Sequence, residues 1–325
     1  ASGVGAFRTT GHRRKSKERL RFISSMNEPG TEGVLLDQGT LHDRLDDAPS
    51  WLREHYRTFR ESMLGERDGS PFPCYFGIEV EREGDLLYAA CESTTDPAAL
   101  LRFRDVLLEY LDAYPDHADR APLAVFFKPP DDDRGEAHYH ERLWHVLEFL
   151  HVHDPEPWPE SIPTDPDDPH WEFCFGGEPL FPTSRAPFYD DRKSRYSPVG
   201  LEITFQPRAV FEGITADTAA GQQARETIRE RMSEYDGVCP HADLGDWGVE
   251  GDREWTQYLF REDEDASPDA CPLEPTREHP KVPDDLLEAG AWRAFAGSDG
   301  RGSAAGSGRS DAGGDAAVTS GLGDD

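Results

Sequence analysis

Apolar residues recur at helical spacing in four segments of the chain. A stripe that repeats every three or four positions is typical of a helix packed on a core through one face. Residues 51–63 follow the start signals Pro49 and Ser50, and residues 97–114 follow Asp96, a favourable N-cap, with Pro97 at the first position. The pattern predicts helices over residues 51–63, 97–114, 139–151 and 218–235.

Other segments have the composition and length of β-strands. FPCYFGIEV and DLLYAACES, separated by the turn-like EREG, predict a hairpin over residues 72–93. APLAVFFKP is almost wholly apolar and predicts a central strand, WEFCFGGEPLFP predicts two strands around a Gly-Gly turn, and VGLEITFQP predicts one more. The order ββαβαβββα, with no internal repeat, predicts a single α+β or α/β domain with a mixed β-sheet flanked by helices.

Composition divides the chain into three parts. Residues 1–40 begin with a basic stretch without the apolar core of a secretory signal, and we interpret them as a flexible arm. Residues 41–261 are long enough to bury a core and form the expected folded domain. Residues 262–325 are acidic and then rich in Gly, Ser, Ala and Asp, which predicts a disordered tail because such a segment buries little apolar surface.

The chain is strongly acidic, with a formal net charge of -31, a pI near 4.6 and a mean hydropathy of -0.73. This balance argues against nucleic acid as a partner, because binding to phosphates depends on Lys and Arg. The acidic residues indicate either a binding surface or a halophile's solvated surface, and we favour the second. The 5 cysteines form no CxxC pair, which favours a reducing cytoplasm, and no run approaches the roughly 18 apolar residues of a membrane span.

Two histidines and one cysteine are candidate ligands. His151 ends an apolar helical stripe, where it can either bond to a main-chain carbonyl or ligate iron. His241 lies in CPHADLGDWG, a loop of the kind that commonly carries function. Cys174 lies between two phenylalanines in a strand and is either a buried thiol or a nucleophile.

Four charged residues stand in aromatic or Pro-bounded strands, where an unpaired charge is costly: Glu172, Glu178, Arg195 and Arg208. They form structural ion pairs or face a polar ligand. An arginine can grip a carboxylate with two hydrogen bonds, and a glutamate can receive a cation. Nearby residues either line an apolar cofactor pocket or belong to the core: Trp158, Trp171, Phe173, Cys174, Phe175, Trp247 and Trp255. The signatures GxGxxG, GxxxxGK[ST], HExxH and GxSxG are missing, so nucleotide, zinc-protease and serine-hydrolase functions lose support.

The order of several short islands resembles the motif series of the YqcI/YcgG family. They are FPCYFG, LHVHDPEPWP, WEFCFGGEPLF, DRKSRYSPVGLEITFQPRAVFEG, RETIRERMSEYDGVCPHADLGDWG and REWTQY, and they span about residues 71–258. Members of this family include haem-dependent N-hydroxylases that act on guanidino amino acids in the guanitoxin and cycloserine pathways. The resemblance implies a haem enzyme that uses dioxygen or peroxide on an arginine-like small molecule.

The same resemblance implies roles for the candidate residues. His151, then His241, and as a third choice Cys174, would hold the haem iron. Glu172 or Glu178 would hold the guanidinium, and Arg195 or Arg208 would hold the carboxylate of the substrate. Two other functions stay open at this point: a haem-binding carrier or sensor without turnover, and a non-haem metal or cysteine hydrolase. The sequence does not indicate the oligomeric state.

Overall fold

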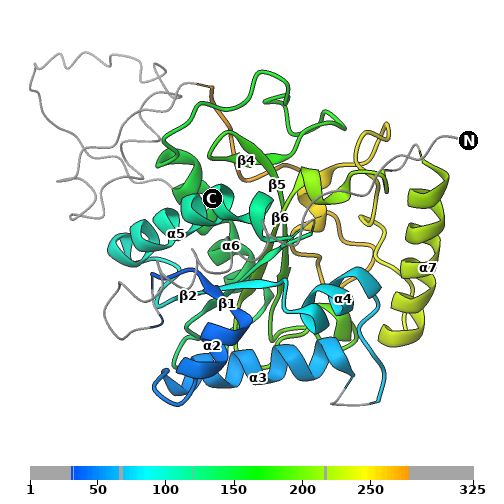
Figure 1. Ribbon diagram of the computed structural model, residues 1–325. Coiled ribbons are helices and arrows are strands. Elements are labelled where there is room, and N and C mark those ends of the chain that lie inside the picture. Colours follow the sequence, from blue (N-terminus) through cyan, green and yellow to red (C-terminus); the bar gives the residue numbers. More distant parts are fainter. Residues whose placement is uncertain (1–30, 32, 66–68, 119, 216–217, 278–325) are drawn as a thin grey trace, which may run out of the picture.

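The computed structural model describes residues 31, 33–65, 69–118, 120–215 and 218–277 (Figure 1). Most of the predicted arm and of the predicted disordered tail, residues 1–30 and 278–325, lies outside these described residues. Residues 31, 33–40 and 262–277 are described, and both stretches contribute to the fold: Leu36 and Leu273 are buried.

The centre of the protein is a mixed sheet of six strands in the order β1-β2-β3-β6-β5-β4. Strands β2 and β3 are parallel, and every other neighbouring pair is antiparallel. The sheet and its flanking helices form an α+β fold, as the sequence predicted. The strands are β1 (Leu36–Asp37), β2 (Leu87–Cys91), β3 (Leu123–Phe127), β4 (Phe173–Phe175), β5 (Glu178–Arg185) and β6 (Glu202–Pro207).

Six α-helices accompany this sheet in the described part of the chain: α2 (Gln38–Arg44), α3 (Ser50–Leu64), α4 (Tyr75–Glu83), α5 (Pro97–His117), α6 (Glu136–Val152) and α7 (Ala219–Asp236). All four predicted helices are confirmed, as α3, α5, α6 and α7. The N-cap prediction at Asp96 is also confirmed, because its carboxylate accepts the backbone N–H of Ala98. Helix α5 provides the crossover that a parallel pair such as β2 and β3 requires.

The helices cover both faces of the sheet, so the core has two parts. Residues Leu87, Ala89 and Cys91 of β2 pack in one cluster with α5 and α6. The alternate residues Tyr88 and Ala90 pack in the other with α2 and α3. Since successive side chains of a strand point to opposite faces, this division explains why the predicted central strands contain almost no polar residue.

The predicted hairpin over residues 72–93 is wrong in its first half. Residues 75–83 form α4, which begins after Cys74 and ends at Gly84 in the left-handed conformation (φ 72°). A short, nearly continuous apolar run does not distinguish a strand from a buried helix, and here Ile78 and Glu81, three positions apart, are both buried. The EREG segment is therefore a helix end. The second half is confirmed as β2.

Candidate functional site

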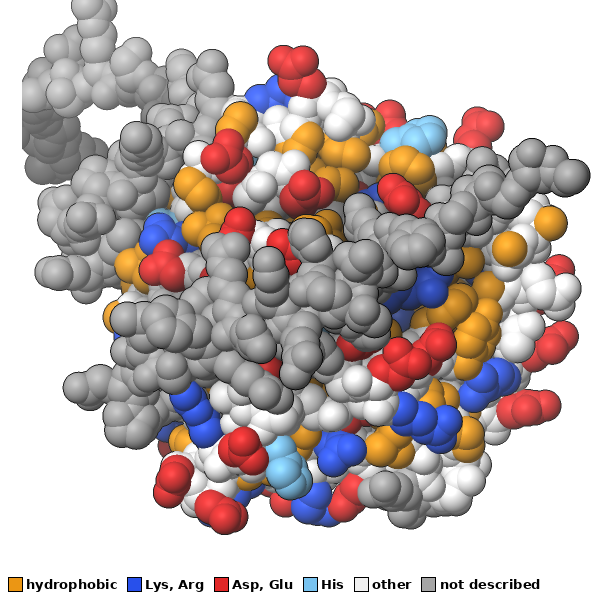
Figure 2. All heavy atoms as spheres, in the orientation of Figure 1, with side chains coloured by type: hydrophobic (Ala, Val, Ile, Leu, Met, Phe, Trp, Pro, Cys, Tyr) orange, Lys and Arg blue, Asp and Glu red, His pale blue; other side chains and the backbone are white. Residues whose placement is uncertain are grey.

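A cavity of about 320 Å³ lies over β5 and β6, with α4 on one side and α7 on the other. Helix α3 and two 3-10 turns, η1 (Lys193–Arg195) and η2 (Arg208–Phe211), complete its walls. Figure 2 shows hydrophobic and basic side chains exposed side by side in the region between α4 and α7. This volume lies within the usual range of roughly 300–1,000 Å³ for small-molecule sites.

The walls of the cavity are mainly apolar. Phenylalanines come from five separate parts of the fold: Phe59, Phe72, Phe76, Phe181 and Phe211. Helix α7, although largely polar, turns Ile228 and Met232 toward the cavity. Such walls can hold the flat apolar body of a ligand and exclude water from it.

The charges in the lining are all positive among the described residues. Four arginines line the cavity, Arg120, Arg185, Arg195 and Arg225, while no Asp or Glu does. The chain as a whole has 65 acidic against 34 basic residues, so the cavity has the opposite sign to the rest of the molecule. The lining therefore suits a ligand that combines an apolar body with anionic groups.

Two of these arginines have carboxylate partners behind the wall. Nη1 of Arg185 lies 3.2 Å from Glu202, whose other oxygen accepts Ser197 Oγ and faces Nδ1 of His55. Burial alone would raise the pKa of Glu202, but Arg185 and His55 hold it below its ordinary value. Arg225 pairs with Asp246. The charges of Arg185 and Arg225 are thus partly compensated without a ligand.

The other two arginines lack such a partner among the described residues. Arg195 is buried, stacks on the ring of Phe260 at 4.3 Å and makes a long hydrogen bond of 3.5 Å to the carbonyl of Ser184. Burial lowers the pKa of Arg195. Arg120 donates to the carbonyl of Val210 and stacks on Phe76.

Cys74 places a thiol at the edge of this cavity. It is the N-cap of α4, so the N–H groups of Phe76 and Gly77 point toward its sulfur. Burial raises the pKa of the Cys74 thiol, while these N–H groups and the charges of Arg231 and Arg120 oppose the rise. A thiol in this position can become a thiolate when a metal replaces its proton.

Glu172 and Arg208, two of the predicted charged residues, form an ion pair with each other. Arg208 donates Nε to Glu172 at 2.7 Å and Nη2 to Glu254 at 2.6 Å, and its guanidinium stacks on Trp247 at 4.7 Å. Both glutamates are buried. Burial raises the pKa of Glu172 to about 8 in spite of Arg208, because two carboxylates share one cation. The three residues form a buried ion-pair cluster that neither of the two cavities includes.

The remaining predicted charged residues lie apart from this cluster. Glu178 is exposed at the start of β5, beside the Gly176–Gly177 turn. Arg195 lines the cavity, and no other residue predicted for the site does so in the described chain.

Both candidate histidines lie away from the two cavities. His151 is buried near the end of α6, with Nε2 accepting the N–H of Thr276 at 3.1 Å and its ring against Trp158. His241 stacks on Phe260, and its Nδ1 accepts the N–H of Asp243.

The predicted aromatic pocket is part of the main core. Trp158, Trp171, Phe173, Cys174 and Phe175 are all at most 2% exposed and pack in the cluster of α5 and α6. The thiol of Cys174 donates to the carbonyl of Glu172, and burial raises its pKa far above the ordinary value. Trp247 is half-buried between Arg208 and His170. The first five residues therefore belong to the core, one of the two alternatives considered for this set.

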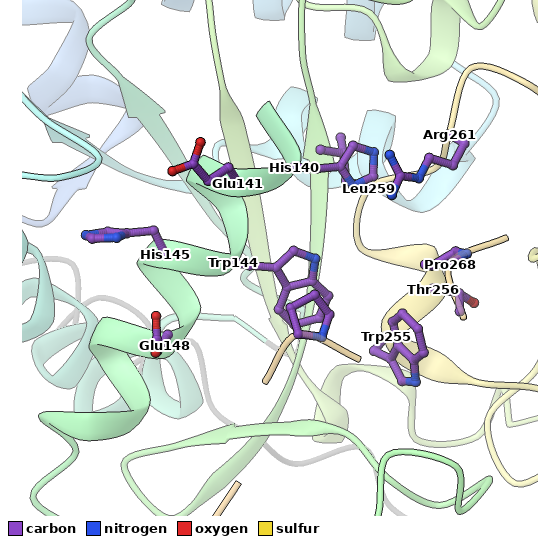
Figure 3. Close-up of a pocket in the computed structure, with 11 residues that line it drawn as sticks. His140, Glu141, Trp144, His145, Glu148, Trp255, Thr256, Leu259, Arg261 and Pro268 are labelled. Carbon is purple, nitrogen blue, oxygen red and sulfur yellow. The ribbon is translucent and has the colours of Figure 1, made fainter. Parts of the chain in front are cut away.

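A second cavity of about 270 Å³ lies between α6 and the segment that follows 3-10 turn η3 (Glu254–Gln257). Figure 3 shows Trp144 and His140 of α6 turned toward Leu259 and Arg261, whereas His145 points to the other side of the helix. Burial lowers the pKa of His140 to about 4, so it is neutral at physiological pH. This cavity holds no thiol and contains carboxylates.

The lining of the larger cavity contains more of the groups that can hold a haem than the surroundings of either histidine do. The thiol of Cys74 can ligate iron, the phenylalanines can contact a macrocycle, and the arginines can neutralise propionates. No cluster of three or more His, Cys, Asp or Glu that could hold a metal ion occurs within the described ranges.

No role was predicted for Cys74, although it stands in FPCYFG, the first island of the resemblance. A Cys-x-x-Gly that begins a helix presents its sulfur to free N–H groups, which is the signal that could have identified it. This Cys-x-x-Gly lies in FPCYFGIEV, which was predicted to be a strand, so the start of a helix at Cys74 was not recognised. Arg185, Arg120 and Arg225 have no comparable local signal.

Comparison with known proteins agrees with the resemblance in the sequence. The chain is 35% identical over 222 residues to "Uncharacterized protein YcgG" of Bacillus subtilis (strain 168), covering 67% of this chain and 87% of that protein. It is 33% identical to "Uncharacterized protein YqcI" of the same organism, covering 66% and 85%. It is 31% identical over 254 residues to "Putative N(omega)-hydroxy-L-arginine synthase DcsA" of Streptomyces lavendulae, covering 76% and 92%. No solved structure matches.

The sequence profile of the YqcI/YcgG family matches residues 59–274. This range includes both walls of the larger cavity, from Phe59 in α3 to Gln257. The chain belongs to the YqcI/YcgG family.

Proposed function

We propose that the protein is a haem-dependent oxygenase that hydroxylates a nitrogen of a guanidino or amino-acid-like small molecule. A relative that matches across 92% of its own length bears the name of an arginine N-hydroxylating enzyme. The observation that carries the proposal is the cavity itself, where a cysteine thiol at a helix N-terminus meets aromatic walls and four arginines.

In this proposal Cys74 holds the iron. Its Sγ faces a cavity wide enough for a ligand, and Gly77 beside it leaves room, since a Cβ there would lie 2.8 Å from Met63 Cε and 4.0 Å from Cys74 Sγ. A thiolate is one of the known proximal ligands of haem iron in oxygenases. When bound, the haem would supply the oxidising chemistry that converts an N–H group into N–OH.

The overall reaction balances in two ways. With dioxygen, one oxygen atom enters the N–H bond, and two electrons from a reductant and two protons convert the other atom to water. With hydrogen peroxide, the peroxide is itself the oxidant and leaves water without a reductant. The protein residues exclude bulk water through the phenylalanine walls and supply a positive field that draws an anionic ligand into the cavity.

Haem titration followed by visible spectroscopy tests the proposal. We expect the purified protein to bind haemin with a Soret band, and its reduced form to give the red-shifted carbon monoxide band of a thiolate-ligated haem. Cys74→Ser should lose that shift. Cys174→Ser and His151→Ala are the matched controls, because both residues lie in the core away from the cavity, and both should keep it.

The other outcomes separate the remaining functions. A Soret band without N-hydroxylated product, when arginine-like compounds, a reductant and oxygen are supplied, would indicate a haem carrier or sensor. An unshifted carbon monoxide band, with haem binding lost in His151→Ala and kept in Cys74→Ser, would move the ligand to His151. Absence of haem binding would overturn the proposal. A cysteine hydrolase receives less support, because no histidine of the described chain lines the cavity beside Cys74 to act as its base.

No helix in the described residues has the length and apolar character needed to cross a bilayer.

A further inference from the structure

Three buried arginines lie together where β5 meets η1, at one end of the cavity. Arg185, Arg192 and Arg195 are 8%, 3% and 9% exposed. Arg195 reaches the carbonyl of Ser184, and the backbone N–H of Ala186 donates to the carbonyl of Arg195, so the side chains of Arg185 and Arg195 start from adjacent backbone. Like charges this close in a buried site repel each other unless anions separate them.

The buried carboxylates of this region are already engaged. Glu202 pairs with Arg185 and also faces His55 and Ser197. Asp236 accepts both the N–H and the hydroxyl of Ser194, with no arginine within ion-pair distance in the described chain.

The partners of Arg192 lie outside the cavity. Arg192 donates to the carbonyl of Cys239, and a half-exposed carboxylate, Glu264, lies at 4.0 Å. No carboxylate of the described residues therefore lies within ion-pair distance of Arg195, although the charge of Asp236 acts on it from farther away.

Donor groups in the pair also remain unused. Nε of Arg185 is buried and has no hydrogen-bond partner in the described part of the protein. Arg195 has only the 3.5 Å bond to Ser184, and its other interaction is with the face of Phe260. Both side chains line the cavity. A planar guanidinium with free donors beside an open space is suited to a carboxylate, which accepts two parallel hydrogen bonds.

We propose that Arg185 and Arg195 form a carboxylate-binding pair that anchors the anionic end of the molecule occupying the cavity. The pair favours ligands that carry a carboxylate on an apolar body over neutral counterparts of the same shape. The inference rests on the proposed function only for the source of the carboxylate, which is a haem propionate or the carboxylate of an amino-acid substrate. The guanidinium of such a substrate finds no carboxylate in the described lining, so its recognition depends on the opposite end of the molecule.

The test compares ligands with and without a carboxylate in the full-length protein. The pairs are haem and haem dimethyl ester, L-arginine and agmatine, and hexanoate and 1-hexanol. The variants are Arg195→Gln, Arg195→Lys and, as a control, Arg229→Gln, which removes the same charge from α7 at a residue that pairs with Asp246 and does not line the cavity. Binding is measured by spectral titration for the haems and by ligand-induced thermal shift for the small molecules.

Arg195→Gln should weaken binding of the carboxylate member of a pair by about 10- to 100-fold and leave its neutral counterpart unchanged. Arg195→Lys should restore part of the difference, and Arg229→Gln should match the wild type. Loss confined to haem identifies the propionate as the occupant, and loss confined to L-arginine identifies the substrate. Without ligand, Arg195→Gln should be at least as stable as the wild type, because it removes a buried charge that has no carboxylate partner.

The two proposals fail separately. If Arg195→Gln binds every carboxylate as the wild type does, the pair is overturned, while haem binding still supports the oxygenase. If the wild type binds no haem but Arg195→Gln loses the shift caused by hexanoate, the pair stands and the oxygenase fails. If no carboxylate binds to the wild type, the pair is overturned as well.

Discussion

Replacing Arg208 by methionine tests whether the cluster of Arg208, Glu172 and Glu254 serves stability or substrate binding. Arg208 contacts both buried glutamates at 2.6–2.7 Å, so Arg208→Met leaves two neighbouring carboxylates in the interior without a cation. Breaking a buried ion pair in this way costs about 3–5 kcal/mol of unfolding free energy. For a domain of this size each kcal/mol corresponds to roughly 2–4 °C in Tm, so we expect a fall of about 6–20 °C.

The loss should depend on pH in a defined direction. Without Arg208 both glutamates have pKa values further above their ordinary range, so protonation relieves their repulsion as the pH falls. Arg208→Met should therefore be least stable at pH 8 and regain stability toward pH 5. Urea denaturation followed by circular dichroism at both pH values measures this difference.

A matched variant separates this effect from simple loss of an arginine. Arg229→Met breaks an ion pair with Asp246 that is partly exposed, and it should cost only about 0.2–1 kcal/mol. The reasoning is refuted if Arg208→Met loses less than about 1 kcal/mol or loses the same amount at both pH values. If it instead keeps its Tm but binds an arginine-like substrate more weakly, Arg208 has the substrate role that the resemblance implied.

Three further predictions concern titration, packing and thiol access. Burial raises the pKa of Glu172 from 4.5 to about 8, so the folded state binds the proton of this carboxyl more tightly than the unfolded state does. The stability that this proton contributes is complete below pH 4.5 and is lost as the pH rises to about 8. The unfolding free energy of Glu172→Gln should therefore fall less over that pH range than that of the wild type. Gly221→Ala should lower the Tm, since a Cβ there would lie 2.1 Å from a backbone oxygen of residue 215, whereas Gly135→Ala, with nothing within 4 Å, should change it little. A thiol reagent should label exposed Cys239 in the native protein and buried Cys174 only after unfolding, and rapid native labelling of Cys174 would contradict its burial.

Local signals in the sequence were sufficient to predict elements that have capping or turn residues at their ends and a regular pattern of apolar residues. Helix α5 has Asp96 and Pro97 at its start and a regular apolar stripe, and the β4–β5 hairpin has its Gly-Gly turn. Helix α4 could not be predicted in this way, because its nine residues are apolar on more than one face: it packs on α3 and also borders the cavity. Its helical state follows from these tertiary contacts.

The site was predictable in its chemistry more than in its geometry. The sequence indicated that charges such as Glu172 and Arg208 must be paired or face a ligand, and the structure shows them paired. It could not indicate that Arg195 would lie beside Arg185, or that Cys74 would face the same space, because these contacts depend on how strands and helices far apart in the chain come together.

The cavity has one wall from α4, early in the described chain, and the other from α7, near its end, with β5 and β6 as its floor. A contiguous fragment that contains all of these surfaces has to include residues 75–236. A molecule bound in the cavity contacts both the early and the late part of the chain. Its binding free energy therefore adds directly to the stability of the folded state. Cells that lack the ligand should accordingly contain less of the protein, because a larger fraction is unfolded and open to proteases at any moment.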